Sequence, residues 1–170
     1  KMSETKRGMA ILYVVIASML WSTAGLLIKW VPWHPLAIAG IRSGIASMVM
    51  LVFILMTQKS WPKKPDKAVM LASVNYVILV MLFVSANKLT TSANAILLQF
   101  TAPAWLMIIG ALFFKEKFVL KDIVTVSVVF IGMILFFVGD IDGGGLLGNN
   151  LAIASGISMA LMILSLKKVK

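Results

Sequence analysis

Long apolar runs alternate with short polar or basic segments along the whole chain. Six such runs cover residues 8–31, 36–56, 68–86, 93–114, 122–138 and 148–166. A helix that crosses the hydrocarbon core of a bilayer needs about 20 mostly apolar residues, and the runs are close to that length. The pattern therefore predicts an all-α integral membrane protein with six transmembrane helices.

The basic residues fall at regular intervals between these runs. Thirteen of the sixteen Lys and Arg residues lie in four clusters, within residues 1–7, 59–67, 115–121 and 167–170. Loops rich in Lys and Arg stay on the cytoplasmic side of a membrane. The clusters thus predict a multi-pass protein of the cell membrane (plasma or inner membrane) with both termini in the cytoplasm.

Composition agrees with a membrane protein and removes nucleic acid as a partner. The chain is 61% hydrophobic, whereas soluble domains are about 45–50% apolar, and its mean hydropathy is +1.01. A net charge of +10 is typical of nucleic-acid binding. Here, however, the cations sit at the ends of the runs, and no soluble domain remains to carry a binding groove.

The inventory of reactive side chains argues against an enzyme. The chain has one histidine, His34, in a predicted outer turn, and no cysteine. All six acidic residues fall at run ends or in loops: Glu4, Asp66, Glu116, Asp122, Asp140 and Asp142. Catalysis needs clustered nucleophiles, bases or metal ligands, so no catalytic residue, metal or cofactor is expected. Proton-coupled carriers commonly use an acid within the membrane, so this inventory favours a facilitator or an exchanger.

Arg42 is the one cation that falls well inside a run. It lies about seven residues into the second run, about 10 Å below its outer end at 1.5 Å per residue. Burying an arginine in hydrocarbon costs at least about 2.5–3.5 kcal/mol. Two interpretations remain open: a cavity cation that holds a carboxylate or phosphate, or a side chain that snorkels to the outer surface.

Pro103 interrupts the fourth run. A proline inside a helix removes the hydrogen bond to the carbonyl four residues earlier, here that of Gln99. A freed carbonyl at this depth must face protein or a wet cavity. The Gln99 side chain lies one turn away on the same face, so the sequence predicts either a kinked, cavity-lining helix or a purely structural kink.

A few polar and aromatic residues inside the runs are further candidates for contacts with a substrate. Trp21, Ser22, Asn75, Tyr76 and Trp105 are each expected either to line the pathway or to fill the helix bundle. Asn75 is also a candidate for a hydrogen bond between helices.

An ordered set of residues resembles the EamA-type domain of the drug/metabolite transporter superfamily. It includes Trp21-Ser22-Thr23 in the first run and Pro35 followed by Arg42 in the second. The stretch NKLTTSANA at 87–95, continuing through Pro103 to FKEK at 114–117, is the closest match.

The resemblance implies one five-helix repeat at residues 8–138, with residues 139–170 as the outer loop and first helix of a second, inverted repeat. A unit of five spans leaves the next unit starting from the opposite side, as an inverted repeat requires. The family's ten-helix carriers contain four helices more. The chain is therefore expected to be a partial carrier or to pair with a second copy or a C-terminal half.

The predicted function is transport of small organic metabolites, with amino acids as one candidate class, by alternating access. Membrane lipid and a small-molecule substrate are the expected partners. The alternative is a channel-like or structural, accessory membrane subunit that assembles with another copy. Flux that saturates with concentration favours the carrier, and flux that rises linearly favours the channel.

Overall fold

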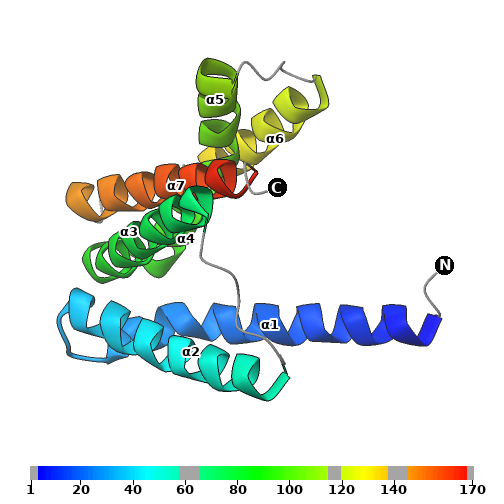
Figure 1. The fold of residues 1–170 in the computed structure, drawn as a ribbon. Helices are drawn as coiled ribbons and strands as arrows, with labels where there is room; N and C mark the ends of the chain where they lie inside the picture. The colour runs from blue at the N-terminus through cyan, green and yellow to red at the C-terminus, as the bar shows by residue number, and fades with distance from the viewer. Residues whose placement is uncertain (1–3, 58–65, 115–119, 138–144, 168–170) are drawn as a thin grey trace.

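The computed structural model is almost entirely helical over the residues that it describes, which are 4–57, 66–114, 120–137 and 145–167. Figure 1 shows the arrangement of its helices. In chain order these are α1 (Glu4–Trp30), α2 (Pro35–Thr57), α3 (Lys67–Leu89), α4 (Ser92–Gln99), α5 (Ala102–Phe114), α6 (Leu120–Phe137) and α7 (Leu146–Leu166).

The helices coincide with the predicted spans, and the all-α membrane architecture is confirmed. Five segments of the described chain are long and apolar enough to cross a membrane: Gly8–Trp30, Pro35–Thr57, Lys67–Leu89, Ser92–Phe113 and Leu146–Leu166. The run at 122–138 falls on α6, whose 18 residues span about 27 Å at 1.5 Å per residue. Residue 138 and most of the basic clusters lie outside the described residues.

The fourth span is fully broken, which corrects the expectation of one kinked helix. α4 ends at Gln99 and α5 begins at Ala102, and the two helices run in different directions (Figure 1). Pro103 is the second residue of α5, in the first turn, where the missing N–H of a proline leaves no helix bond unmade. The chain starts a new helix there instead of bending the old one.

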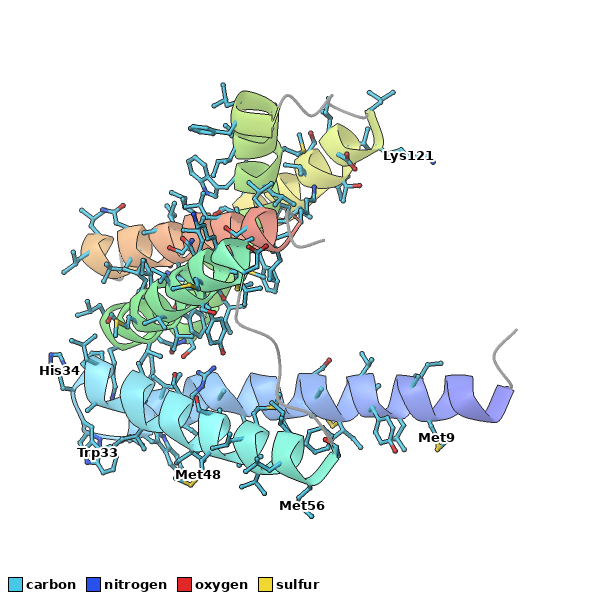
Figure 2. The ribbon with its side chains drawn as sticks, in the orientation of Figure 1. Met9, Trp33, His34, Met48, Met56 and Lys121 are labelled. Carbon is cyan, nitrogen blue, oxygen red and sulfur yellow. The ribbon has the colours of Figure 1, made fainter. Side chains whose placement is uncertain are left out.

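α3 is the centre of the packing. Val80 and Val84 of α3 form one buried cluster with Ile28 of α1 and with Ile38 and Ala39 of α2. Ala86 forms a second cluster with Ala95 of α4 and Ala152 of α7, and α7 makes its most extensive contacts with α3. By contrast, Met9 of α1 and Met48 and Met56 of α2 project away from the other helices (Figure 2) and are exposed.

The helix ends that the sequence assigns to the outer side meet at one end of the molecule. The last turn of α1, the end of α3 and the starts of α2, α4 and α7 lie together there (Figure 1). Side-chain hydrogen bonds join α3 to α1 through Lys88, and the α3–α4 turn to α7 through Thr90 and Asn149. Alternating spans place these ends on one side of a membrane.

Candidate functional site

Thr101 organises the joint between α4 and α5. Its backbone N–H donates to the carbonyl of Leu98 at 3.2 Å, and its Oγ1 donates to the same carbonyl at 2.7 Å. The carbonyl of Thr101 accepts from the N–H groups of Ala104, at 3.0 Å, and Trp105, at 3.3 Å. The indole Nε1 of Trp105 also donates to Thr101 Oγ1 at 3.2 Å. One residue thus closes α4, opens α5 and fixes the orientation of the Trp105 ring.

The Gln99 carbonyl, to which Pro103 has no N–H to donate, lies against α7. A Cβ added to Gly156 would lie 2.9 Å from the Gln99 carbonyl oxygen and 3.0 Å from Thr101 Oγ1. Real Cβ atoms do not approach backbone oxygen so closely, so a residue without a side chain is needed there. Of the two environments that the sequence left open for this carbonyl, the structure shows protein on this face.

Gly156 belongs to a ladder of small residues on α7. Gly148, Ala152, Gly156 and Ala160 recur every fourth residue, are all buried, and are followed by buried Leu164. Residues four apart lie on one helix face. Small residues on such a face let helix backbones approach closely within a membrane. This face packs along α3, α4 and α5.

Hydrogen-bonding side chains gather where the α3–α4 turn meets α1 and α7. We call this group, Asn87, Thr90, Ser92, Asn94 and Asn149, the polar corner. Ser92 Oγ donates to Asn87 Oδ1 at 2.8 Å and approaches the Gly25 carbonyl of α1 at 3.5 Å. Thr90 Oγ1 donates to Asn149 Oδ1 of α7 at 2.8 Å, and Asn94 Nδ2 donates to Thr90 Oγ1 at 3.5 Å. The corner therefore links four helices.

Two polar atoms of this corner are buried without a hydrogen-bond partner among the described residues. They are Nδ2 of Asn87, whose side chain is fully buried, and Oδ1 of Asn94, which is 4% exposed. An unmet donor or acceptor costs about 1–3 kcal/mol. The corner therefore has one hydrogen-bond donor and one acceptor that its own internal hydrogen bonds do not use.

Close backbone contacts hold α7 on this corner. A Cβ on Gly148 would lie 2.8 Å from the backbone of both Leu89 and Thr90. Gly145, just before α7, has a φ of +30° and lies against the Leu89 carbonyl. On the α1 side, a Cβ on Gly25 would lie 3.3 Å from Ser92 Cβ.

Lys88 fastens the end of α1 to α3. Its Nζ donates to the carbonyl of Val31 and, at 3.4 Å, to that of Lys29. A cation at the C-terminal end of a helix satisfies free carbonyls and complements the helix dipole. The lysine therefore caps α1.

Sequence reasoning missed the polar corner as a site. The sequence does place five uncharged polar side chains close together, at position 87 and within residues 90–94. A polar turn between two spans is, however, also what a solvent-facing loop looks like. Only the return of α7, which brings Asn149 and Gly148 to the turn, makes the group an interior one.

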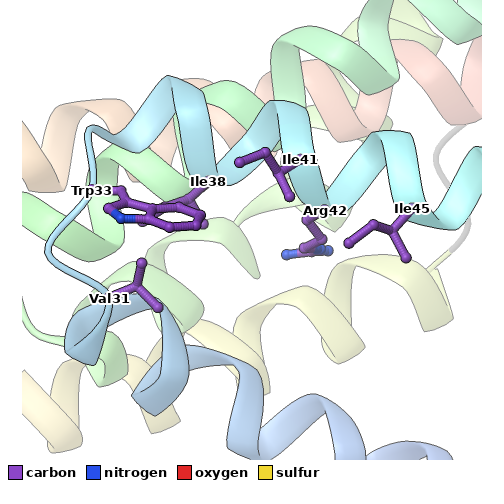
Figure 3. A pocket seen from close by; sticks show the side chains of 6 residues that line it. All are labelled: Val31, Trp33, Ile38, Ile41, Arg42 and Ile45. Carbon is purple, nitrogen blue, oxygen red and sulfur yellow. The ribbon is translucent and has the colours of Figure 1, made fainter.

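Arg42 lies apart from the α4–α5 joint. It is on α2, which packs against α3 through Ile38 and Ala39, and its side chain is exposed. It lines a shallow pocket of about 290 Å³ at the outer end of α2, together with Val31, Trp33, Ile38, Ile41 and Ile45 (Figure 3). The structure does not bring Arg42 together with Gln99.

The other predicted residues are placed as follows. Gln99 and Trp105 are half-buried at the joint, Pro103 is exposed there, and Tyr76 is exposed on α3. Asn75 is buried, but its Nδ2 donates to the Leu71 carbonyl of its own helix at 2.9 Å, so the bond that we see is not one between helices. The side chains of Trp21 and Ser22 lie outside the described residues.

Within the described ranges, no three His, Cys, Asp or Glu side chains come close enough together to hold a metal ion. The chemistry available at the joint and corner is hydrogen bonding by amides, hydroxyls and backbone carbonyls, with one aromatic ring of fixed orientation. Such groups bind and orient polar solutes.

Comparison with known proteins identifies the family of this chain. The model of the EamA-like transporter family matches residues 8–138, which is most of the chain. Neither the curated proteins nor the solved structures give a match. With its apolar spans and its broken fourth span, this chain is a membrane protein that belongs to the EamA-like transporter family.

Proposed function

We propose that this protein carries small organic metabolites across a cell membrane by alternating access, and that amino acids are the first substrate class to test. Membership of a transporter family and five segments fit to span a membrane support the proposal. The substrate is a small molecule, and the surrounding lipid is the protein's other partner.

The break between α4 and α5 is the observation that carries the proposal. Residues 100–101 interrupt a span of 22 residues, Ser92–Phe113, near its middle. Substrate sites of transporters cluster at discontinuous helices near the bilayer midplane. A protein that only needed to fill a membrane would gain nothing from two helix ends at that depth, because each free backbone group there is costly.

The residues that we assign to substrate contact surround this break and the neighbouring helices. The hydrogen bond to Thr101 holds the Trp105 ring in a fixed orientation, which suits stacking on a flat or amphipathic solute. Gln99 offers a donor and an acceptor. Tyr76 on α3 and Arg42 on α2 are proposed as further contacts, the latter for an anionic group, and Trp21 and Ser22 are assigned from the sequence.

Coupling to protons is not part of the proposal. Asp66 and Asp122, the two acids whose side chains the structure describes, lie just before α3 and in the first turn of α6. Proton relays in membranes use acids inside the spans. We therefore propose a facilitator or an exchanger, completed by a second copy or by a C-terminal half. α7 begins on the side where α1 ends, which is what an inverted second repeat requires.

Solute flux tests the proposal. The purified chain, reconstituted in liposomes, is given a panel of labelled amino acids, sugars and nucleosides. A carrier predicts uptake that saturates with concentration and that speeds up when unlabelled solute is trapped inside. Uptake that rises linearly and ignores trapped solute indicates a channel. Absence of uptake for the whole panel, from vesicles that contain folded protein, favours a structural or accessory subunit.

The orientation in the membrane has its own test. The chain has no cysteine, so single cysteines at Ser60 and Gly144 report the side of each loop. The basic clusters predict that a membrane-impermeant thiol reagent labels Gly144→Cys in intact cells and spares Ser60→Cys. Labelling of Ser60→Cys contradicts cytoplasmic termini.

A further inference from the structure

The pocket at the outer end of α2 combines one cation with apolar walls. Figure 3 shows the Arg42 guanidinium between Ile45 on one side and Trp33 and Ile38 on the other. The remaining lining residues are Val31 and Ile41, so Arg42 is the only charged group among the residues that line it. Its volume of about 290 Å³ is at the lower end of the usual range for ligand pockets.

The position of Arg42 favours an anion as its partner. It lies about 10 Å inside the outer end of α2, and its side chain is exposed, not packed into the bundle. Within the described part of the chain, no carboxylate is paired with its guanidinium. An unpaired guanidinium at this depth of a membrane is unfavourable by at least about 2.5–3.5 kcal/mol. A bound phosphate or carboxylate removes that cost and accepts two parallel hydrogen bonds from the guanidinium.

The same face of α2 continues as an apolar track. Ile38, Ile41 and Ile45 share this face with Val49, Val52 and Met56, at the spacing of a helix. The last three side chains are exposed, Met56 by 82%. Trp33, at the start of the track, belongs to the turn that the sequence assigns to the outer surface, where indole rings are enriched at the headgroup level. A ligand head at Arg42 therefore meets an apolar surface that can accommodate an attached chain over about three turns.

We propose that this pocket binds an amphipathic anion, with a phosphate or carboxylate head on Arg42 and an apolar tail along Ile45, Val49 and Val52. The proposal rests on the anion-binding role of Arg42 in the proposed function and adds that the ligand must carry a tail. The ligand is either an anionic lipid of the bilayer or a transported solute of the same chemistry.

Binding is measured on the full chain in neutral detergent, as the shift in thermal unfolding midpoint and as the change in tryptophan fluorescence. The probes are octyl phosphate, which has a head and a tail, and inorganic phosphate, which has the head only. Half-saturation by octyl phosphate is expected at a concentration at least tenfold lower than for inorganic phosphate. In Trp33→Phe the fluorescence response should be lost, whereas the shift in midpoint should remain.

Variants separate the head from the tail. Arg42→Met should weaken octyl phosphate about 10- to 100-fold, the loss expected for a hydrogen bond to a charged group, and Arg42→Lys should retain part of the affinity. Ile45→Gln should weaken octyl phosphate and leave inorganic phosphate unchanged. Lys121→Met removes an exposed cation on α6 (Figure 2) and should change nothing. Equal affinity for the two probes, or undiminished octyl phosphate binding by a folded Arg42→Met protein, overturns the proposal.

The source of the anion is decided in nanodiscs. If phosphatidylglycerol discs suppress octyl phosphate binding and phosphatidylcholine discs do not, the pocket holds a bilayer lipid. If octyl phosphate binds equally in both, the site serves a solute. Either result supports an amphipathic anion, while binding with no flux in the liposome assay contradicts only the proposed transport.

Discussion

α7 and α1 are both long apolar helices, yet they are packed very differently. Eight residues of α7 are buried, whereas Gly25 and Ile28 are the buried residues among the described side chains of α1. The first half of α1 is rich in exposed Leu, Ile and Val, while the buried face of α7 consists mainly of glycine, alanine and serine. In a membrane, helices associate through small residues and polar contacts, because lipid already satisfies large apolar side chains.

A large side chain on the small-residue ladder of α7 should have the largest effect on stability. In Gly148→Leu the new Cβ meets the backbone of Leu89 and Thr90 at 2.8 Å, and backbone cannot yield as a side chain can. We expect a loss of about 3 kcal/mol or more in unfolding free energy, at the upper end for overpacking.

Gly44→Leu on α2 is the matched control, because a Cβ there has nothing within 4 Å. It should be neutral or stabilising by up to about 1 kcal/mol, since glycine is a poor helix former. Denaturation in detergent compares the two variants. Equal losses would show that α7 does not dock as described.

Removing the hydroxyl that links the α3–α4 turn to α7 should have the next largest effect. Thr90→Val keeps the shape and loses the bonds to Asn149 and Asn94. The buried Asn94 amide and the half-buried Asn149 amide then lack these partners, at a cost of about 2 kcal/mol. Thr125→Val on α6 is the control, because that hydroxyl is exposed and bonds only the Lys121 carbonyl of its own helix. The same denaturation assay should show a loss for Thr90→Val alone.

Pro103→Ala tests the joint itself. It restores the N–H that can reach the Gln99 carbonyl and should join α4 to α5, with stability kept or raised. If the break shapes the pathway, transport should fall about tenfold, the equivalent of about 1.4 kcal/mol. Distances between spin labels on α4 and α5 report the straightening.

Pro35→Ala is the control for that variant. Pro35 is the first residue of α2, where a proline leaves no helix bond unmade, so flux should not change. Full transport by a straightened Pro103→Ala protein would leave the break with a structural role only.

The smallest effect is expected at the cap of α1. Lys88→Met removes the donor to the Lys29 and Val31 carbonyls and should destabilise by about 1 kcal/mol. The loss should appear as faster hydrogen exchange in the last turn of α1, with the α3–α7 contact unchanged. Unchanged protection from hydrogen exchange in that turn would show that Lys88 does not cap α1.

The sequence predicts the spans well because their signal is local. About 20 apolar residues between basic or turn-forming ends specify a transmembrane helix whatever its neighbours, and the observed ends of α2 and α7 lie within two residues of the predicted ones. Pro103 likewise marks the broken span through its missing N–H. A full break was not predicted, because the two hydrogen bonds from Thr101 to the Leu98 carbonyl depend on three-dimensional geometry.

The sites were harder to predict because they depend on which helices meet. Arg42 and Gln99 were each predicted as substrate contacts, but the sequence does not say whether they meet: α2 carries Arg42 to the pocket at its outer end, and Gln99 lies at the α4–α5 joint against α7. The polar corner requires α7 to return to a turn about 60 residues earlier in the chain, and spacing along the sequence does not encode that contact.

The central claim is that α7 closes on the α3–α4 turn, and a cysteine pair tests it directly in native membranes. Thr90→Cys with Asn149→Cys replaces two side-chain oxygens that lie 2.8 Å apart, in a chain without other cysteines. Docking of α7 on the turn predicts rapid intramolecular bridging by a short bis-thiol reagent, independent of protein dilution. It also predicts little bridging of Asn149→Cys to Ser18→Cys on the exposed half of α1. No bridge at the Thr90 pair, or equal rates for both pairs, would contradict the docking of α7.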